Sequence, residues 1–515
     1  MEWFDDWALS LATFLPLVGA AILLALPKER ENVIKTVALG ASILCAVIGI
    51  GILFRFDFSG DVAGYQFEAN RKWISAIGTN YHIGLDGISL PLFILALGIT
   101  LLVIIYSWDH FPEPHNPKMF LFLILLLETG MLGSFISLDL ILFFVFFEIV
   151  LLPMYFMIAV WGGENRAYAS IKFFLFTMFG SAFMLVSFLA LYFMSTLPSG
   201  GHTFDIVHLS DQDLGVLSDL GTTAGRWIFA GMFLGFAIKV PMWPVHTWLP
   251  DAHTEAPTQG SVLLAAVLLK MGTYAFVRIS LPILPDAARD FAPYIGLLAV
   301  IGIIYGSLAC LAQTDVKRLI AFSSVGHMGF VMLGIATLTP IGINAALFGM
   351  ISHGIVTGLL FFLAGSMQHR YHTREISRLG GLLISMPRLG GLLVFTSFAS
   401  LGLPALAGFP GEFSSMLSAY QPAEGLNEAV FRTFMVIAAV GTVLTAGYML
   451  YMLQRVAQGK VPDEWAGHTF HDIGTFEYMS WVPLVLMTVV LGVFPGILMS
   501  VTDKSVMSIF SGIFG

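Results

Sequence analysis

Apolar segments of about 20 residues, separated by short polar ones, follow one another along the whole chain. A helix needs about 20 apolar residues to cross the hydrocarbon of a bilayer. The pattern therefore predicts an all-α polytopic membrane protein with about fourteen transmembrane helices. The predicted helices cover residues 8–26, 33–54, 83–106, 118–136, 139–160, 168–194, 227–249, 257–281, 291–311, 318–338, 342–367, 389–421, 431–455 and 479–501.

Two of these helices are interrupted. The stretch GMFLGFAIKVPMWPVHTWLPDAHTEAPTQGSVLLAAVLLK (231–270) contains Pro241 and Pro244. Proline removes a backbone donor and breaks the helical hydrogen-bond ladder, so we expect a broken helix there. The predicted helix at 389–421 is interrupted by Gly402, Pro404, Gly408, Pro410 and Gly411.

The two interrupted helices hold matching places in two successive sets of five helices. Because five is odd, the second set enters the membrane from the opposite side, and paired broken helices are typical of inverted-repeat transporters. Two unrelated proline kinks are the alternative. We therefore expect N-terminal helices at 1–117, a first inverted repeat at 118–281, a second at 291–455, and a C-terminal loop with the last helix at 456–515.

Composition excludes a soluble domain. Hydrophobic residues make up 57% of the chain and charged residues 11%, against about 25% charged in soluble proteins. No basic cluster suits nucleic acid. Cys45 and Cys310 lie in apolar segments and are expected to be small buried hydrophobic residues. The acidic N-terminus lacks the basic region of a signal peptide, so we expect the first helix to be retained.

Basic residues predict the orientation. The loops after odd-numbered helices contain 14 Lys and Arg, and the other loops contain 8. The side with more Lys and Arg is expected to be cytoplasmic. Both termini are then on the outer side, and a bacterial plasma membrane is the favoured location, with the mitochondrial inner membrane as the alternative.

Six ionisable residues lie near the middle of predicted helices. At about 1.5 Å of rise per residue, all of them except the last, which follows a helix break, lie near the bilayer midplane. A charged group there costs about 2.5–3.5 kcal/mol on insertion scales and is a functional-site hypothesis by default. Their shared depth indicates a row of titratable groups parallel to the membrane: Glu148, Lys239, Lys270, His327, His353 and Glu412.

Pairing lowers the cost of burial, so Glu148 is expected to face Lys239. A buried lysine gives up its proton readily and an opposing carboxylate reverses this, so the pair suits proton transfer. A static ion pair between two helices is the alternative. His327 and His353 are candidate relays, because histidine titrates near neutral pH, or alternatively hydrogen-bonded core residues.

Polar residues after the first helix break form a second group. His246 is the candidate relay between the two lysines. Asp251, His253 and Glu255 are expected in a turn at the cytoplasmic end, as solvated caps. The chain contains no phosphate-binding glycine motif, C-x-x-C, or haem or iron–sulfur spacing, so we expect no metal or cofactor in it. The energy for transport must then come from partners or from an ion gradient.

The residues around the first break also resemble a known family. FAIKVPMWPVHTWLPDAHTEAPTQGSVLLAAVLLKMGTY, DLILFFVFFEIVLLPMY and GFPGEF are similar to segments of the antiporter-like membrane subunits of respiratory complex I and of multisubunit sodium/proton antiporters. Glu412, where sibling subunits usually have lysine, and the end of the chain soon after the last predicted helix resemble the M type (NADH dehydrogenase subunit 4 type).

The resemblance implies one proton channel in the membrane arm of a proton-translocating NADH-quinone oxidoreductase. The six residues of the row match the family's proton-transfer positions. NADH, FMN, iron–sulfur clusters and quinone are then expected in partner subunits, with L- and N-type subunits and phospholipids as neighbours. A sodium/proton antiporter subunit and a non-conducting spacer of the membrane arm are the alternatives.

Overall fold

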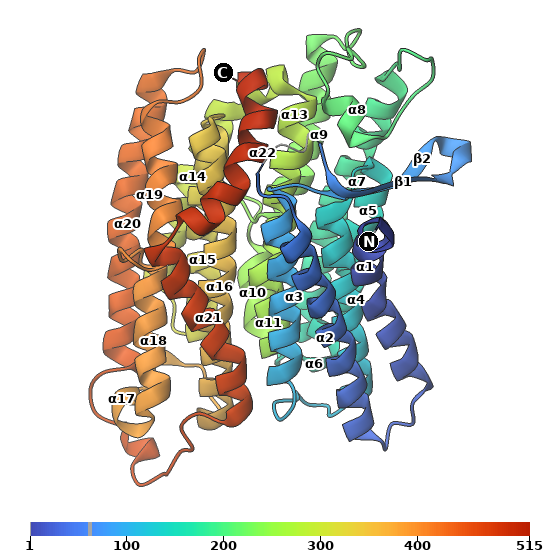
Figure 1. The fold of residues 1–515 in the computed structure, drawn as a ribbon. Coiled ribbons are helices and arrows are strands. Elements are labelled where there is room, and N and C mark those ends of the chain that lie inside the picture. Colours follow the sequence, from blue (N-terminus) through green and yellow to red (C-terminus); the bar gives the residue numbers. More distant parts are fainter. Residues whose placement is uncertain (1, 60–63, 515) are drawn as a thin grey trace.

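The structure is a computed structural model that describes residues 2–59 and 64–514. It is a bundle of steeply inclined helices, with one small antiparallel hairpin at its side (Figure 1). The first part of the chain forms α1 (Glu2–Ala25), α2 (Glu31–Arg55), β1 (Gln66–Ile74), β2 (Thr79–Leu85), α3 (Ser89–Tyr106), α4 (Pro117–Ile136), α5 (Leu140–Ile149), α6 (Leu151–Trp161) and α7 (Arg166–Met194).

The remaining helices follow in the same way. The middle of the chain forms α8 (Ile206–Ser210), α9 (Thr222–Lys239), α10 (Trp248–Glu255), α11 (Thr258–Leu263), α12 (Leu269–Ala275) and α13 (Leu281–Ile283), with π-helical turns at Leu264–Leu268 and Phe276–Ser280. The last part forms α14 (Pro285–Leu311), α15 (Val316–Ala336), α16 (Pro340–Tyr371), α17 (Leu382–Ser385), α18 (Pro387–Ser400), α19 (Gly408–Tyr420), α20 (Glu428–Val456), α21 (Thr475–Val493) and α22 (Gly496–Phe514).

The prediction of an all-α polytopic fold is confirmed. Within the described ranges, thirteen helices are long and apolar enough to cross a membrane. They comprise twelve of the predicted helices and α22. The two predicted helices with Pro and Gly interruptions are not among them, because each is divided: α9 ends at Lys239 before α10, and α18 ends at Ser400 before α19.

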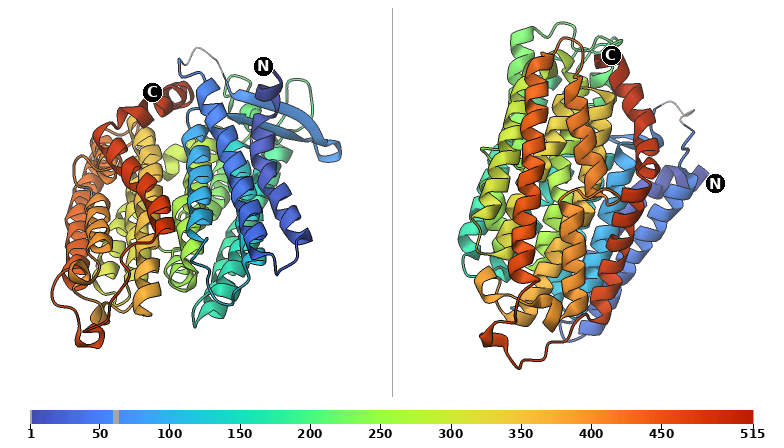
Figure 2. Two further views of the ribbon diagram at one scale, coloured as in Figure 1. Left: turned by 60° about the horizontal axis from the view of Figure 1, so that its bottom comes forward. Right: turned by 90° about the vertical axis from the view of Figure 1, so that its left-hand side faces the viewer.

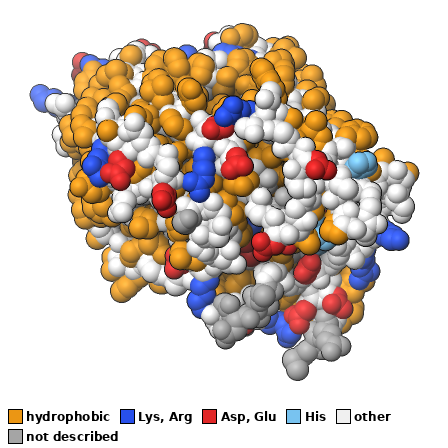
Figure 3. Space-filling model, turned by 90° about the horizontal axis from the view of Figure 1, so that it is seen from above, with side chains coloured by type: hydrophobic (Ala, Val, Ile, Leu, Met, Phe, Trp, Pro, Cys, Tyr) orange, Lys and Arg blue, Asp and Glu red, His pale blue; other side chains and the backbone are white. Residues whose placement is uncertain are grey.

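We use two names for the ends of the bundle. The hairpin face, at the top of Figure 1, includes β1–β2, α8 and α13, and the loop face, at the bottom, includes α17 and the α1–α2 turn. The predicted orientation makes the hairpin face the outer one. Seen from that side, hydrophobic side chains line much of the rim, and charged side chains lie mostly inside it (Figure 3).

The most deeply buried helices form the core of the bundle. The membrane-spanning windows of Thr258–Ile283, α15 and α16 are entirely buried, whereas α1, α2, α20 and α21 each expose a broad apolar side. Figure 2 shows α1 and α2 at one end of the elongated outline and α20 near the other, whereas α21 packs against α3 and α16. An apolar exposed side is compatible with lipid or with a partner subunit.

Helix starts follow local sequence rules. Asn116, Asp139, Asp315, Thr339 and Asn427 each accept a hydrogen bond from a backbone N–H of the helix that follows. These are the residue types that satisfy the free donors of a helix N-terminus. Both α4 and α16 also begin with proline, which needs no partner for a missing N–H.

Several predicted helix boundaries differ from the structure, and three of the differences change an element. Residues 83–85 belong to β2, because 66–85 form a hairpin in which polar and apolar residues alternate, and α3 begins only at Ser89. The predicted helix at 227–249 stops at Lys239. The predicted helix at 479–501 is two helices that meet at Phe494 and Pro495, and the chain continues as α22 to Phe514.

Candidate functional site

Lys270 and His353 form the centre of the buried ionisable groups. Lys270 lies in α12, between the two π-helical turns, and its ammonium donates to the Ala265 carbonyl. Its Nζ also lies 2.6 Å from Nδ1 of His353 on α16. When Lys270 is protonated, Nδ1 accepts this bond, because an ammonium only donates. Nε2 of His353 has no hydrogen-bond partner among the described residues.

The π-helical turn explains why the Ala265 carbonyl is accessible. The Leu269 N–H donates to the carbonyl of Leu264, five residues earlier, and not to Ala265 as an α-helix requires. The Ala265 carbonyl is therefore released to face Lys270. π-helical turns occur frequently at functional sites for this reason.

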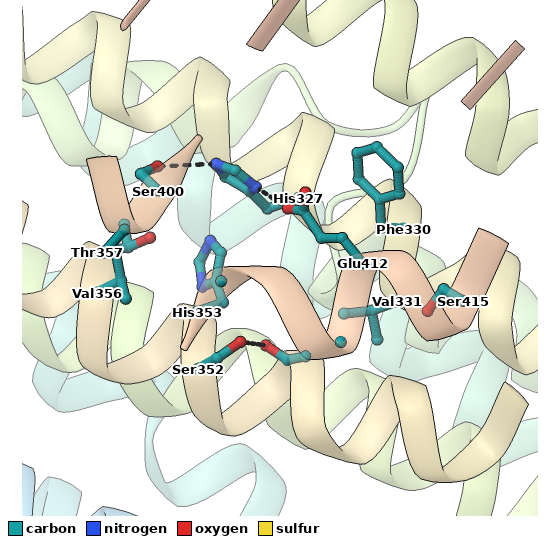
Figure 4. A pocket seen from close by; sticks show the side chains of 14 residues that line it. His327, Phe330, Val331, Ser352, His353, Val356, Thr357, Ser400, Glu412 and Ser415 are labelled. Carbon is teal, nitrogen blue, oxygen red and sulfur yellow. Dashed lines mark hydrogen bonds and ion pairs between the residues drawn. The ribbon is translucent and has the colours of Figure 1, made fainter. Parts of the chain in front are cut away.

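His327 and Glu412 form the second pair of this group. His327 on α15 places Nδ1 2.6 Å from a carboxylate oxygen of Glu412, in the first turns of α19. Its Nε2 lies 3.1 Å from Oγ of Ser400, the last residue of α18. Figure 4 shows the imidazole between these two oxygens. The break between α18 and α19 thus supplies partners to both ring nitrogens.

A small cavity joins the two pairs. It has a volume of about 20 Å³, and a water molecule needs about 10–15 Å³. His327 and His353 both line it, with ring centroids 5.8 Å apart (Figure 4). The structure thus brings four of the six predicted residues into one group: Lys270, His353, His327 and Glu412.

Glu148 and Lys239 lie apart from this group. Lys239 is buried at the end of α9, with its ammonium 4.7 Å from the centre of the Phe147 ring. Glu148 accepts a hydrogen bond from Ser181 of α7. Among the described residues no salt bridge joins the two side chains, but their charges interact electrostatically, as expected for two groups that face each other. A cation over an aromatic face is itself favourable, so Phe147 also stabilises the Lys239 ammonium.

The predicted relay His246 is placed elsewhere. Its ring packs edge-on against Tyr305, with centroids 4.9 Å apart, and also contacts Phe322. In the part of the chain that the structure describes, no hydrogen bond or ion pair joins His246 to either Lys239 or Lys270. The structure therefore gives no direct bridge between the two lysines.

Several further ionisable residues are buried, and the burial of His253 and Lys317 was not predicted. His253, expected to be a solvated cap, is fully buried and stacks on Phe361, with centroids 4.4 Å apart. Lys317, counted among the loop residues, is also buried, and its ammonium donates to the Ala256 carbonyl. Glu128 of α4 is fully buried beside α2. His253 and Lys317 are buried because α16 packs over the 250–257 segment. The sequence alone does not separate them from solvated loop residues.

A histidine on the hairpin face is clamped between two carboxylates. His82 of β2 lies 2.8 Å from Asp205, the cap of α8, and 2.8 Å from Glu68 of β1. Burial lowers the pKa of His82, but the hydrogen bonds and charges of Asp205 and Glu68 outweigh it and raise the pKa above its ordinary value. The same contact lowers the pKa of Asp205, against the effect of burial.

The fold and this network define a polytopic helical membrane protein with transporter-like buried ionisable groups. A family model described as "NADH:quinone oxidoreductase/Mrp antiporter, TM" matches residues 137–445, and one described as "NADH-ubiquinone oxidoreductase chain 4, amino terminus" matches residues 66–133. The chain belongs to the NADH:quinone oxidoreductase/Mrp antiporter family.

Relatives match the chain along almost its whole length. It is 40% identical to NADH-quinone oxidoreductase subunit M of Rickettsia prowazekii over 97% of both chains. It is 41% identical to subunit M of Rhodobacter capsulatus over 97% of this chain and 95% of that one. A chain of respiratory complex I from Thermus thermophilus with bound NADH is similar in structure, with a TM-score of 0.85, 30% identity and coverage of 98% and 100%. The Mrp complex from Dietzia shares the fold, with a TM-score of 0.82 and 20% identity over 100% of both chains.

Proposed function

We propose that this chain is a membrane-arm subunit of a proton-translocating NADH-quinone oxidoreductase and moves protons outward across the bilayer. Its similarity to subunit M relatives along 97% of its length supports this assignment. The observation behind the proton path is the group from Lys270 through His353 and His327 to Glu412. Redox chemistry belongs to partner subunits in this proposal, and L- and N-type subunits are the proposed neighbours.

The hydrogen bonds define two transfer steps. The Lys270 ammonium can pass a proton along its 2.6 Å bond to Nδ1 of His353, leaving a neutral amine beside the Ala265 carbonyl. His327 can exchange a proton with Glu412 along the other 2.6 Å bond. The 5.8 Å between the two rings exceeds hydrogen-bond reach, so transfer between them needs a water molecule or a ring movement.

Lys239 and Glu148 take a second role in the proposal. Their charges interact across Phe147 without a direct bond. A movement of α5 or α9 changes the distance between Glu148 and Lys239. It therefore changes the free-energy cost of keeping the Lys239 ammonium buried at the helix break. Each proton that crosses works against about 2.3 kcal/mol per 100 mV, and partner subunits must supply that energy.

The test is alanine substitution of Lys239 and of Glu412, with the exposed Glu424→Ala as the matched control. Proton uptake per NADH oxidised is measured in inverted membrane vesicles that contain the assembled complex. We expect both buried variants to lose coupled pumping and the control to retain it. Full pumping and normal assembly of both buried variants would mean that the chain is only a non-conducting spacer of the membrane arm. Proton movement that depends on sodium would favour the antiporter function.

The orientation is part of the same proposal. With the loop face cytoplasmic, both termini lie outside, and a bacterial plasma membrane is the favoured location. Single cysteines placed near each terminus should react with an impermeant maleimide from the outer side only. Labelling from the cytoplasmic side would reverse the proposed orientation of the chain in the membrane.

A further inference from the structure

A large polar cavity opens between the helix ends on the loop face. It has a volume of about 750 Å³ and lies among the ends of α3, α6, α10, α15 and α16. We call it the loop-face cavity. Its lining includes His110, Glu255, Lys317, His369 and Arg374. Titratable groups of both charge signs therefore meet in a space that reaches from the surface towards the centre of the bundle.

Lys317 is the buried cation of this cavity. It begins the first turn of α15 and is 2% exposed, although it follows a polar loop. The Ala256 carbonyl accepts its hydrogen bond. The charged groups that interact with it are Asp315 and Glu255, which stabilise the ammonium, and Arg374, which opposes it. A buried lysine in such a setting changes its protonation easily.

His253 lies three residues before Ala256, whose carbonyl accepts the hydrogen bond of Lys317. The ring is fully buried against Phe361, and neither ring nitrogen has a hydrogen-bond partner among the described residues. It interacts electrostatically with Lys317, which lines the cavity, and with Lys270. His353, the partner of Lys270, also interacts with His253. An unbonded buried imidazole thus interacts both with a lining residue of the cavity and with the Lys270–His353 pair.

We propose that protons enter from the loop-face cavity at Lys317 and pass through His253 to Lys270. In this transfer a water molecule or a side-chain movement carries a proton from the Lys317 ammonium to a ring nitrogen of His253 and leaves a neutral amine. The other N–H proton of His253 passes in the same way to Lys270, once Lys270 has given its own proton to His353 and is a neutral amine. The cavity then reprotonates Lys317. The proposal rests on the proposed function and adds the entry site and two proton-transfer residues.

A purely structural role for Lys317 makes a different prediction. Lys317 and Arg374 both donate to carbonyls at the end of α10, those of Ala256 and Thr254. Cations stabilise a helix C-terminus in this way. An arginine at position 317 keeps that charge and can donate to the carbonyl, but it does not release its proton. Lysine-to-arginine substitution therefore separates proton transfer from capping.

The first experiment is Lys317→Arg in the complete complex, with Lys172→Arg as the matched control. Lys172 is a half-buried lysine at the loop face, paired with Asp251 at 2.7 Å. We expect NADH-driven proton uptake in inverted vesicles to fall about 100-fold for Lys317→Arg and to be unchanged for Lys172→Arg, at equal assembly. His253→Phe should cause a similar loss, because phenylalanine keeps the stacking on Phe361 and breaks no hydrogen bond.

The outcomes are distinct. Normal pumping by both Lys317→Arg and His253→Phe, with Glu412→Ala inactive, overturns the entry proposal and leaves the proposed function intact. Normal pumping by Glu412→Ala as well would overturn the proposed function itself. If Lys317→Arg prevents assembly, His253→Phe alone decides the entry proposal.

The second experiment blocks the cavity directly. Thr258 lines it, whereas Lys28 is exposed on the same face outside it. Both native cysteines are buried, so a new cysteine can be labelled selectively. We expect a bulky impermeant maleimide on Thr258→Cys to reduce proton uptake, and the same label on Lys28→Cys to have no effect. Labelling of Thr258→Cys with undiminished uptake would contradict entry through this cavity.

Discussion

At the residue scale, individual buried charges affect both the stability of this protein and its proposed proton transport. Lys270 has two hydrogen-bond partners, Ala265 and His353, and no carboxylate among its recorded contacts. An ionised group at this depth costs about 2.5–3.5 kcal/mol on insertion scales, and no carboxylate offsets that cost. The residue is therefore expected to destabilise the protein while serving its function, as active-site groups commonly do.

Substitution of this lysine should accordingly separate stability from transport. We expect Lys270→Met to abolish proton pumping and to raise the free energy of unfolding by about 1–3 kcal/mol. Thermal unfolding of the purified complex and proton uptake in vesicles measure the two effects. Leu269→Met, at the neighbouring buried position, is the control. A less stable Lys270→Met protein would mean that the hydrogen bonds outweigh the cost of burial.

His82 gives a pH dependence on the hairpin face. Its pKa is raised in the folded protein, so the stability it contributes is complete below its ordinary pKa of about 6.5 and is lost as the pH rises through the higher folded value. We expect His82→Gln to lower the unfolding temperature by about 2 °C at pH 5.5 and by less at pH 9. Thermal unfolding at both pH values is the measurement. An equal loss at both would contradict the charged state.

At the element scale, close helix contacts hold the ionisable groups in register. A Cβ on Gly411 would lie 2.9 Å from the backbone of Gly349, so α19 touches α16 one residue before Glu412. This contact fixes the carboxylate beside His327. The geometry of the second pair thus depends on a residue with no charge.

Gly411→Ala should therefore impair transport without removing any ionisable group. Overpacking of this kind costs about 1–3 kcal/mol, and we expect it to displace Glu412 and reduce proton uptake. Gly391→Ala in α18 is the control, because a Cβ there meets nothing within 4 Å. Unchanged uptake by Gly411→Ala would show that the helix contact does not position the carboxylate.

The sequence predicted the elements better than it predicted their partners. Helix length and hydrophobicity identified the spans, and proline identified the break after Lys239. The β1–β2 hairpin was missed because its alternation is short and mostly polar. Depth in the helix identified Lys270 and His353, but periodicity says nothing about which helices pack together. His253 and Lys317 lie next to polar loops, and only tertiary packing buries them.

At the scale of the whole molecule, α22 links the backbone before α3 to α16. Ser505 accepts a hydrogen bond from the Gly87 N–H before α3, and Asp503 accepts one from Asn344 of α16. A Cβ on Gly87 would lie 2.0 Å from the Val501 carbonyl oxygen. The last helix is therefore seated directly on the backbone that precedes α3.

Gly87→Ala should release this helix. We expect faster proteolysis of the chain after Pro495 and less assembled complex, measured by limited proteolysis and native gel electrophoresis of membranes. Gly98→Ala within α3 is the control, since a Cβ there has no neighbour within 4 Å. Protection equal to that of the unsubstituted chain would show that α22 is held mainly by α16.

The π-helical turn before Lys270 has a consequence for reading related sequences. Such a turn holds one residue more than the α-helical turn it replaces. A chain shorter by one residue within 264–268 would keep the faces of α11 and α12 but return the Ala265 carbonyl to an ordinary helical bond. A relative that is one residue shorter within 264–268 would then have a lysine at the position of Lys270 without a hydrogen bond to a backbone carbonyl.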